Sequence, residues 1–193
     1  MSLADNFMWF PPKHPSDPPE IEGETRDEFF RQKRAFEVLS FRFSVSLSDR
    51  SATSSGDGGG GANAVVAPVA FDTFTITKVM DAASPMLYQV MCQHAPSQQS
   101  PDPTRIPAAM MAMRKPGGEF LLYLQFYFKE LVITDLEWEG GGGDTPPTET
   151  VTFAFNAMGV QYRKQASKGG IAGRTSWGWD IPGNKALTGA GYL

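Results

Sequence analysis

The 193-residue sequence has one cysteine, two histidines and no excess of basic residues, and each shortage excludes a class of protein. Cys92 has no second cysteine to pair with, so an internal disulfide framework cannot form. Together with His14 and His94 it offers too few nitrogen and sulfur ligands for a structural zinc site. The 17 basic and 21 acidic residues give a net charge of −4, which argues against a nucleic-acid-binding surface.

Long apolar runs and targeting segments are missing too. No apolar stretch approaches the roughly 20 residues that a membrane-spanning helix needs, so we expect no membrane insertion. Residues 1–15 lack the basic start and the clean apolar core of a standard signal peptide. The length suits one domain over residues 1–193, made in the cytoplasm, where a single cysteine stays reduced. If the chain leaves the cell, we expect export without a signal peptide.

Residue pairs with catalytic potential occur twice, and neither pair predicts an enzyme. Cys92 and His94 lie two positions apart on a predicted helix, where they point to nearly opposite sides. Glu137 and Glu139 share one face of a strand end and form a pair of carboxylates suited to acid–base work. Solvated charges that discourage stray strand pairing give a simpler account of that pair. We expect neither catalytic residues nor a bound metal or cofactor.

The two glycine runs, Gly58–Gly61 and Gly140–Gly143, are not phosphate-binding loops. Neither is followed by Lys and Ser/Thr, and neither stands between a strand and a helix. The sequence also contains no G-x-S-x-G motif of a serine hydrolase. We interpret both runs as flexible connectors, and we predict that the chain is not an enzyme.

Two long strand-like runs dominate the rest of the pattern: Glu119–Glu139 and Thr148–Gln165, joined by the polar linker Gly140–Pro147. Both are rich in aromatic and β-branched residues, and neither keeps a helical apolar period. In the first run, apolar residues occupy both faces: Phe120, Leu122, Leu124, Phe126 and Phe128 on one, and Leu121, Tyr123 and Tyr127 on the other. Such a strand needs cover on both sides, from a second sheet, a helix or a neighbouring subunit.

Shorter strand patterns and one helix complete the prediction. Further strands are expected at Asn6–Phe10, Ala35–Leu47, Phe71–Val79, Ile106–Arg114 and near Trp177–Ile181. A helix is predicted over Pro85–Gln93, with Ser84 as its N-cap and an apolar stripe of Met86, Leu87, Val90 and Met91. The sum is a mainly β fold, an antiparallel β-barrel or sandwich with one flanking α-helix.

Three segments fall outside these patterns. Residues 11–20 form a proline-rich insertion, residues 48–68 a flexible glycine-rich loop, and residues 166–193 a tail that we expect to be loosely structured. Within the tail, Trp177 and Trp179 share one strand face, where they would either stack a sugar or base or pack the tail on the body.

Several segments follow one another in a recognisable order over most of the chain. They are Ile21–Thr25, Phe36–Ser46, Gly56–Ala62, Phe71–Met91, Arg114–Thr134, Pro147–Tyr162 and Gly178–Ala186. This order resembles that of the haemolysin-coregulated proteins (Hcp), the inner-tube subunits of bacterial type VI secretion. The chain departs from the family pattern at the proline-rich insertion and at Ala95–Arg105, which is longer than the usual helix-to-strand connection.

The resemblance implies a β-barrel-like subunit, six copies of which form a hexameric ring around a wide channel. Rings of that family stack into a tube that a contractile sheath drives out of the bacterial cell with a spike protein at its tip. Some members shelter effector proteins in the channel. The loop over Leu47–Pro68 corresponds to one that reaches a neighbouring subunit or ring. The expected interface residues are Asp57, Gly58, Gly59, Gly60, Gly61, Ala62 and Asn63.

Three alternatives stay open at this point. A monomeric β-sandwich would bind a carbohydrate or peptide through Trp177, Trp179 and the glycine loops. A hydrolase would depend on Glu137 and Glu139 or on Cys92. A ring that acts mainly as an effector chaperone would co-purify with a small protein even without a sheath.

Overall fold

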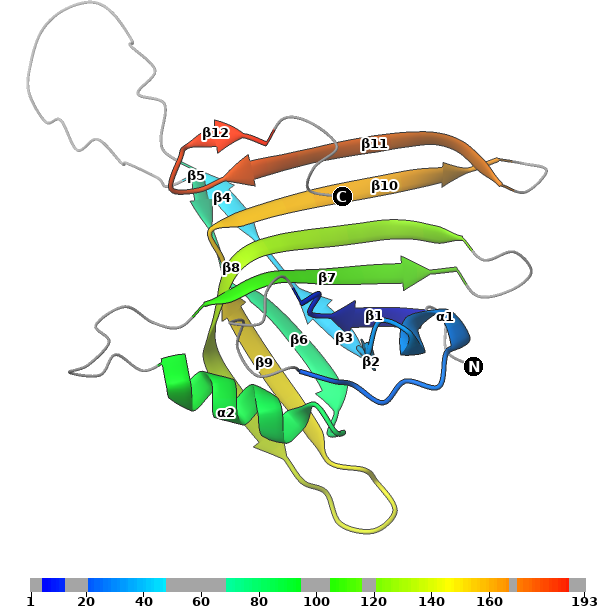
Figure 1. Cartoon of the computed structure of the whole chain (residues 1–193), viewed down its shortest axis with the longest axis vertical. Coiled ribbons are helices and arrows are strands. Elements are labelled where there is room, and N and C mark those ends of the chain that lie inside the picture. Colours follow the sequence, from blue (N-terminus) through cyan, green and yellow to red (C-terminus); the bar gives the residue numbers. More distant parts are fainter. Residues whose placement is uncertain are drawn as a thin grey trace, which may run out of the picture.

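The computed structural model describes residues 5–12, 21–47, 69–94, 105–115, 121–166 and 170–187. Most of this backbone lies in antiparallel strands, with two helices (Figure 1), so the prediction of a mainly β antiparallel fold is confirmed. The helices are α1 (Glu28–Arg31) and α2 (Ser84–His94). The strands are β1 (Asp5–Trp9), β2 (Phe36–Glu37), β3 (Ser40–Arg42), β4 (Val45–Leu47), β5 (Val69–Phe71), β6 (Phe74–Val79), β7 (Ile106–Arg114), β8 (Leu122–Glu139), β9 (Thr148–Ala154), β10 (Ala157–Gln165), β11 (Ile171–Asp180) and β12 (Lys185–Ala186).

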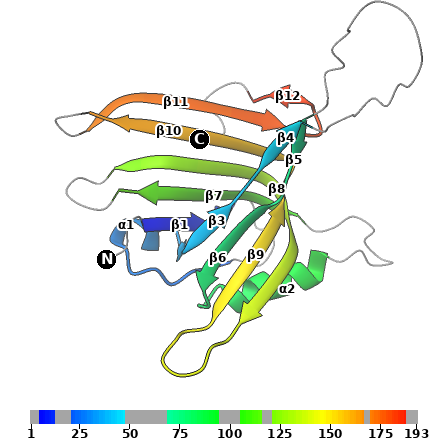
Figure 2. The same cartoon turned by 180° about the vertical axis from the view of Figure 1, so that it is seen from behind.

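Two layers of strands share the long strand β8. The first runs in the order β12-β11-β10-β8-β7-β1-β2, and the second joins β3, β6 and β9 to the other half of β8. Seen from behind, β3, β6 and β9 cross the strands of the first layer at a steep angle (Figure 2). The main core lies where the layers face each other, and it is rich in aromatic rings. Among its fully buried members are Phe36, Phe74, Phe128 and Phe153.

β8 changes sheets in its middle. Its first half pairs with β7 and β10, and its second half, from Val132 on, pairs with β9. The change coincides with Glu130, whose φ of 52° lies in the left-handed region, and with a register shift between Ile133 and Asp135. Such irregularities bend a strand and increase its local twist. The bend therefore lets one strand serve both layers.

The chain itself covers much of both apolar faces of β8. Phe126 and Phe128 point into the main core. Tyr127, on the opposite face, is only 9% exposed because it packs against Ala108 and the partly buried Leu187. No neighbouring subunit is needed to cover the middle of β8, so its doubly apolar pattern does not by itself indicate assembly.

Helix α2 confirms the predicted helix, and α1 is a single turn that the sequence pattern misses. Ser84 is the first helical residue of α2 and not the N-cap, a difference of one position. Leu87 and Val90 of the predicted apolar stripe are fully buried in the main core. Helix α1 begins after Asp27, whose Oδ1 accepts hydrogen bonds from the N–H groups of Phe29 and Phe30 at 3.1 Å each.

Several predicted runs are divided differently in the structure. Thr148–Gln165 is two strands, β9 and β10, interrupted at Phe155 and Asn156, where the Asn156 N–H donates to the Lys129 carbonyl at 3.0 Å. Ala35–Leu47 contains β2, β3 and β4. The tail was expected to be loose, but β11 is a ten-residue strand that pairs with β10 along its length. The short strand predicted near Trp177–Ile181 is therefore the end of a longer strand that begins at Ile171, and the prediction of a loose chain is wrong over residues 171–176.

Candidate functional site

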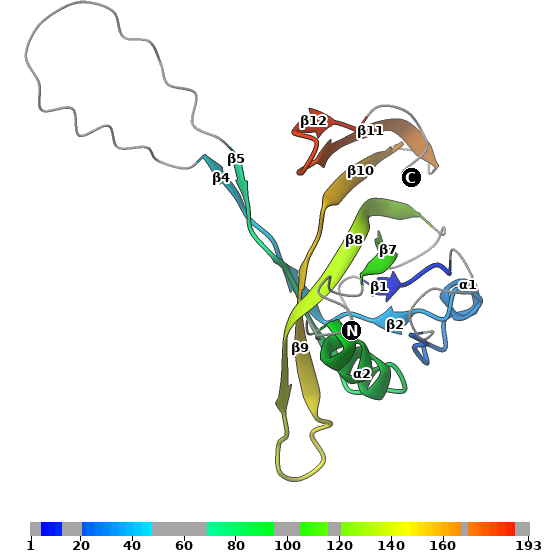
Figure 3. The ribbon, with the colours of Figure 1, turned by 60° about the vertical axis from the view of Figure 1, so that its left-hand side comes forward.

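Strands β4 and β5 form an arm that leaves the body of the molecule on the side away from both helices (Figure 3). The two strands pair through Val45 with Phe71 and Leu47 with Val69. The arm is unusually apolar for an exposed element: Leu47 is 66% exposed, Val45 48% and Val69 46%. Exposed apolar groups gathered on one element mark an interaction surface more often than singly scattered ones do.

Polar contacts fix the base of the arm. The Ser44 hydroxyl donates to Asp72 Oδ2 at 2.9 Å, and the Asp72 N–H donates to the Ser44 carbonyl at 3.1 Å. The Thr73 N–H donates to Asp72 Oδ1 at 2.8 Å. The hydrogen bond from Ser44, followed by the one from Thr73, lowers the pKa of Asp72. The direction in which the arm leaves the body is thus set by a hydrogen-bonded junction.

Strand β11 forms a second exposed surface at one edge of the first sheet. It pairs with β12 through Trp179 and Asp180, and the Leu187 N–H donates to the Gly178 carbonyl at 2.9 Å, so within the described residues the backbone of 171–177 has no strand partner on that side. Trp177 is 55% exposed and stacks on Trp179 with ring centroids 5.5 Å apart and an angle of 23°. Tyr162, on the neighbouring strand β10, is 49% exposed. An open edge with exposed rings is a template for pairing with another chain.

The aromatic surface on β11 continues the main core. Trp177 lies opposite Val160 of β10, which lies opposite Phe126 of β8. Opposite residues in a sheet point to the same face, so an apolar row runs from the buried core out to the exposed edge. The tryptophan pair therefore packs on the body only in part, and Trp177 remains available for contact.

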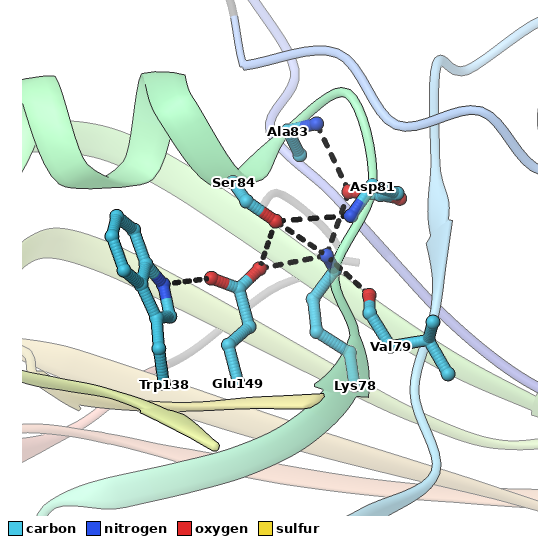
Figure 4. A network of polar contacts seen from close by, with 7 residues as sticks. All are labelled: Lys78, Val79, Asp81, Ala83, Ser84, Trp138 and Glu149. Atoms are coloured by element: carbon cyan, nitrogen blue, oxygen red, sulfur yellow. Dashed lines mark hydrogen bonds and ion pairs between the residues drawn. The ribbon is translucent and has the colours of Figure 1, made fainter. Parts of the chain in front are cut away.

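A buried charge network joins β6, β9, β8 and the start of α2 (Figure 4). Lys78 and Glu149 have side chains that are 0% exposed, and Lys78 Nζ lies 2.8 Å from Glu149 Oε1. Lys78 Nζ also donates to Asp81 Oδ1 at 2.6 Å and to the Val79 carbonyl at 2.9 Å. Ser84 Oγ donates to Glu149 Oε1 at 2.6 Å, and Trp138 Nε1 donates to Glu149 Oε2 at 3.0 Å.

This network fastens helix α2 to the second sheet. Every buried charge in it has an opposite charge or a hydrogen-bond donor, as buried ions require. The sequence prediction missed it, although a signal exists. Lys78 shares a strand face with the core residues Phe74 and Ile76, and Glu149 shares one with Val151 and Phe153. Opposite charges at inward positions of two strands predict that those strands pair, and Lys78 does lie opposite Glu149.

A second polar cluster ties β1, α1 and β7 together. Arg114 Nη2 donates to Asp5 Oδ2 at 2.6 Å, and Arg114 Nη1 donates to Asp27 Oδ2. The guanidinium also lies 5.4 Å from the centre of the Phe7 ring. Partial burial raises the pKa of Asp27, but the Phe30 N–H and Arg114 outweigh it, so that the pKa is lowered overall. Asp5 and Asp27 therefore both bind Arg114 of their own chain.

The residues considered for catalysis lie on two elements, Glu137 and Glu139 on β8 and Cys92 and His94 on α2. Glu137 and Glu139 are both exposed. Cys92 is exposed, and its contact with the Tyr88 hydroxyl raises the pKa of Tyr88. His94 is the last residue of α2. His14 and the predicted interface residues, Asp57 to Asn63, lie outside the described residues.

The described residues contain no group of three or more His, Cys, Asp or Glu residues suited to holding a metal. Neither helix among them is long and apolar enough to cross a membrane.

An apolar arm and an open aromatic edge on a β-rich fold are surfaces of the kind that contact other chains. Residues 7–162 match the family model described as "Type VI secretion system effector, Hcp". The chain therefore belongs to the Hcp family of type VI secretion proteins.

Individual relatives agree with this. Protein hcp1 of Pseudomonas aeruginosa is 30% identical over 112 residues, covering 57% of this chain and 64% of that protein. The match thus spans somewhat less than two-thirds of that relative's length. Among solved structures, one described as a type six secretion system protein has a TM-score of 0.73 at 21% identity, covering 95% of this chain and 99% of its own. Hcp1 from Salmonella typhimurium has a TM-score of 0.67 at 23% identity, covering 96% and 99%. These likenesses show the shared fold.

Proposed function

We propose that the chain is a non-enzymatic structural subunit of type VI secretion. Six copies form a ring, and rings stack into an inner tube that a contractile sheath expels with a spike protein at its tip. Effector proteins are the cargo of the channel, and the subunit itself leaves the bacterial cell. Membership of the Hcp family supports this proposal.

The observation that carries the proposal is the pair of exposed surfaces, the arm and the β11 edge. They differ in shape and chemistry: the arm is an aliphatic hairpin, while the edge presents Trp177 and unpaired backbone. Two unlike surfaces that bind each other make a heterologous contact, and such contacts close into rings when the rotation between copies allows it. A single copy in water would leave both surfaces wet, which costs free energy.

The glycine-rich segment at the end of the arm is proposed to contact the adjacent ring. Leu47 and Val69 are the last described residues on either side of it, and Asp57 to Asn63 lie at its centre. The four glycines among them, Gly58 to Gly61, have no side chain and so allow close approach of two backbones. We predict that deletion of residues 51–64 leaves rings intact but weakens their stacking.

The mass of the protein in solution tests whether six copies form a ring. We expect a mass of six chains for the wild type, and dissociation on replacing Trp177 with Ser. Tyr88→Ser is the matched control, because Tyr88 is also an exposed aromatic (52% against 55%) but lies on α2. A monomeric wild type at high concentration would contradict the proposal, and so would equal effects of the two substitutions.

One observation favours a second candidate, a monomeric module that binds a carbohydrate or peptide. Trp177 and Trp179 stack on an exposed strand, where a sugar ring would meet Trp177. That candidate predicts a monomeric mass and a change of tryptophan fluorescence with a ligand, which Trp177→Ser abolishes without altering the mass.

A further inference from the structure

The β8–β9 hairpin, made of the second half of β8, residues 140–147 and β9, projects from the body of the molecule (Figures 1 and 3). Its charge is of one sign: residues 130–162 of the sequence contain six acidic residues and no lysine or arginine. Residues 79–104, which include α2, contain no lysine or arginine either. Lys78, the base that precedes them, is buried and paired with Glu149. The hairpin is therefore a negatively charged projection.

Three of these acids form a row on one face of β8. Asp135, Glu137 and Glu139 are all exposed, and the β9 residues opposite them are threonines. Alternate residues of a strand share a face and lie about 7 Å apart, so the three carboxylates repel one another. Charges that only keep a strand soluble need no counterpart elsewhere in the molecule, but this acidic row has one.

The counterpart lies where β10 ends and β11 begins. Residues 163–193 contain five lysines and arginines and a single acid. Arg163 and Arg174 lie directly opposite each other in the sheet, and Lys164 is the next residue along β10. Arg163 Nε donates to Oε1 of the buried Gln161 at 2.7 Å, which holds this guanidinium in place. Like charges directly opposite each other destabilise a strand pair, so carboxylates that reach this basic end stabilise it.

The acidic row and the basic end cannot meet within one copy. In Figure 1 the β8–β9 hairpin lies at the bottom, whereas the end of β10 and the start of β11 lie at the right. The view from behind separates them as well (Figure 2). Two unlike surfaces of opposite charge on different sides of a molecule favour a head-to-tail contact between copies.

We propose that the acidic row of one copy binds the basic end of a second copy. Glu137 and Glu139 of the first copy face Arg163 and Arg174 of the second. Opposite residues in an antiparallel pair have Cα atoms about 5 Å apart, which is close to the spacing of the acids along β8. The contact rests on the proposed function in one respect, that copies of the chain assemble, and it sets their relative orientation.

Charge reversal in two separate proteins tests this contact, with the assembled mass measured by sedimentation velocity. The first protein carries Glu137→Lys and Glu139→Lys, and the second carries Arg163→Glu and Arg174→Glu. Either protein alone brings like charges together at every contact, so each should need at least about ten times the wild-type concentration to assemble. In an equal mixture each hairpin meets a basic or acidic end of opposite charge on the other protein, so assembly should return to the wild-type level.

The matched control is Glu24→Lys with Glu28→Lys, which makes the same change of net charge at two exposed acids outside the hairpin. It should assemble as the wild type does. Raising the salt from about 50 to about 500 mM should weaken wild-type assembly and should reduce the defect of each reversed protein. Circular dichroism checks that every variant is folded. If a reversed protein does not fold, Glu137→Gln with Glu139→Gln replaces it and should still weaken assembly about threefold.

Four outcomes would each overturn the inference. Wild-type assembly by the first reversed protein alone would do so and would leave the proposed ring intact. Failure of the mixture to assemble would show that the acids serve another purpose, such as binding a cationic protein of a different kind. An equal defect in the control would show that net charge matters and the contact does not. A wild type that stays monomeric would contradict the inference and the proposed function together.

Discussion

Replacing Lys78 with Met should destabilise the folded chain by about 3 kcal/mol or more. The substitution keeps most of the side-chain volume but leaves the Glu149 carboxylate buried without its cation. Both side chains are 0% exposed, and the Lys78 Nζ to Glu149 Oε1 distance is 2.8 Å. Breaking a buried ion pair from one side typically costs about 3–5 kcal/mol. The lower end applies here, because Ser84 and Trp138 still donate to Glu149 at 2.6 and 3.0 Å.

Removing both charges should cost much less than the two single changes together. In Lys78→Met/Glu149→Leu no ion remains between β6 and β9, and the Asp81 carboxylate, 11% exposed, keeps its hydrogen bond from the Ala83 N–H at 2.9 Å. Ser84 Oγ still accepts from the Asp81 N–H at 3.0 Å, and Trp138 is 48% exposed, so its N–H can reach water. Well-packed apolar substitutes for a buried pair are often close to neutral. We therefore expect a coupling energy above about 2 kcal/mol between the two sites.

Urea unfolding followed by circular dichroism measures these changes. It should be repeated at two protein concentrations, because assembly would add a concentration-dependent term to the free energy of unfolding. Glu22→Gln is the control: Glu22 pairs with Arg34 at 2.7 Å, but both side chains are about half exposed. We expect that change to cost about 0.5 kcal/mol or less. A Lys78→Met cost below about 1 kcal/mol, or single costs that simply add in the double variant, would refute the reasoning.

Two further predictions concern the helix α1 region. The lowered pKa of Asp27 contributes stability that is present above the ordinary carboxyl pKa near 4 and is lost as pH falls through the folded value. Asp27→Asn can still cap α1, and in this variant the free energy of unfolding should fall less steeply with pH below about pH 4 than in the wild type. The same pH dependence in both proteins would contradict this prediction. Gly23→Ala should destabilise the fold by about 1–3 kcal/mol, because the added Cβ would stand 2.4 Å from the Ala35 carbonyl oxygen. A melting temperature equal to that of the wild type would show that this backbone contact gives way easily.

The strands and helix with a regular apolar period could be predicted from the sequence, and the exceptions have physical causes. Leu87 and Val90 recur at helical spacing, so α2 was predictable. The switch of β8 between sheets was not, because it depends on the backbone of Glu130, a polar residue with no special local pattern. The break at Asn156 was not predictable either, because the apolar residues before and after it form one continuous strand-like pattern in the sequence.

The exposed surfaces were only partly predictable. Trp177 and Trp179 were identified as sharing a face, but their strand was placed too late, because Gly170 and Gly173 obscured its start. Strand β4 of the arm is the end of the predicted strand Ala35–Leu47, whereas β5 begins two residues before the predicted strand Phe71–Val79. The exposure of the arm depends on how Ser44 and Asp72 meet across 28 residues.

The double membership of β8 has a mechanical consequence. A pull on the tip of the β8–β9 hairpin runs along the β8 backbone into the half that is bonded on both sides to β7 and β10. Many hydrogen bonds along that half then resist the load in shear, together, instead of opening one after another. A force applied at one end of this fold is therefore transmitted to both sheets, and the two sheets move together.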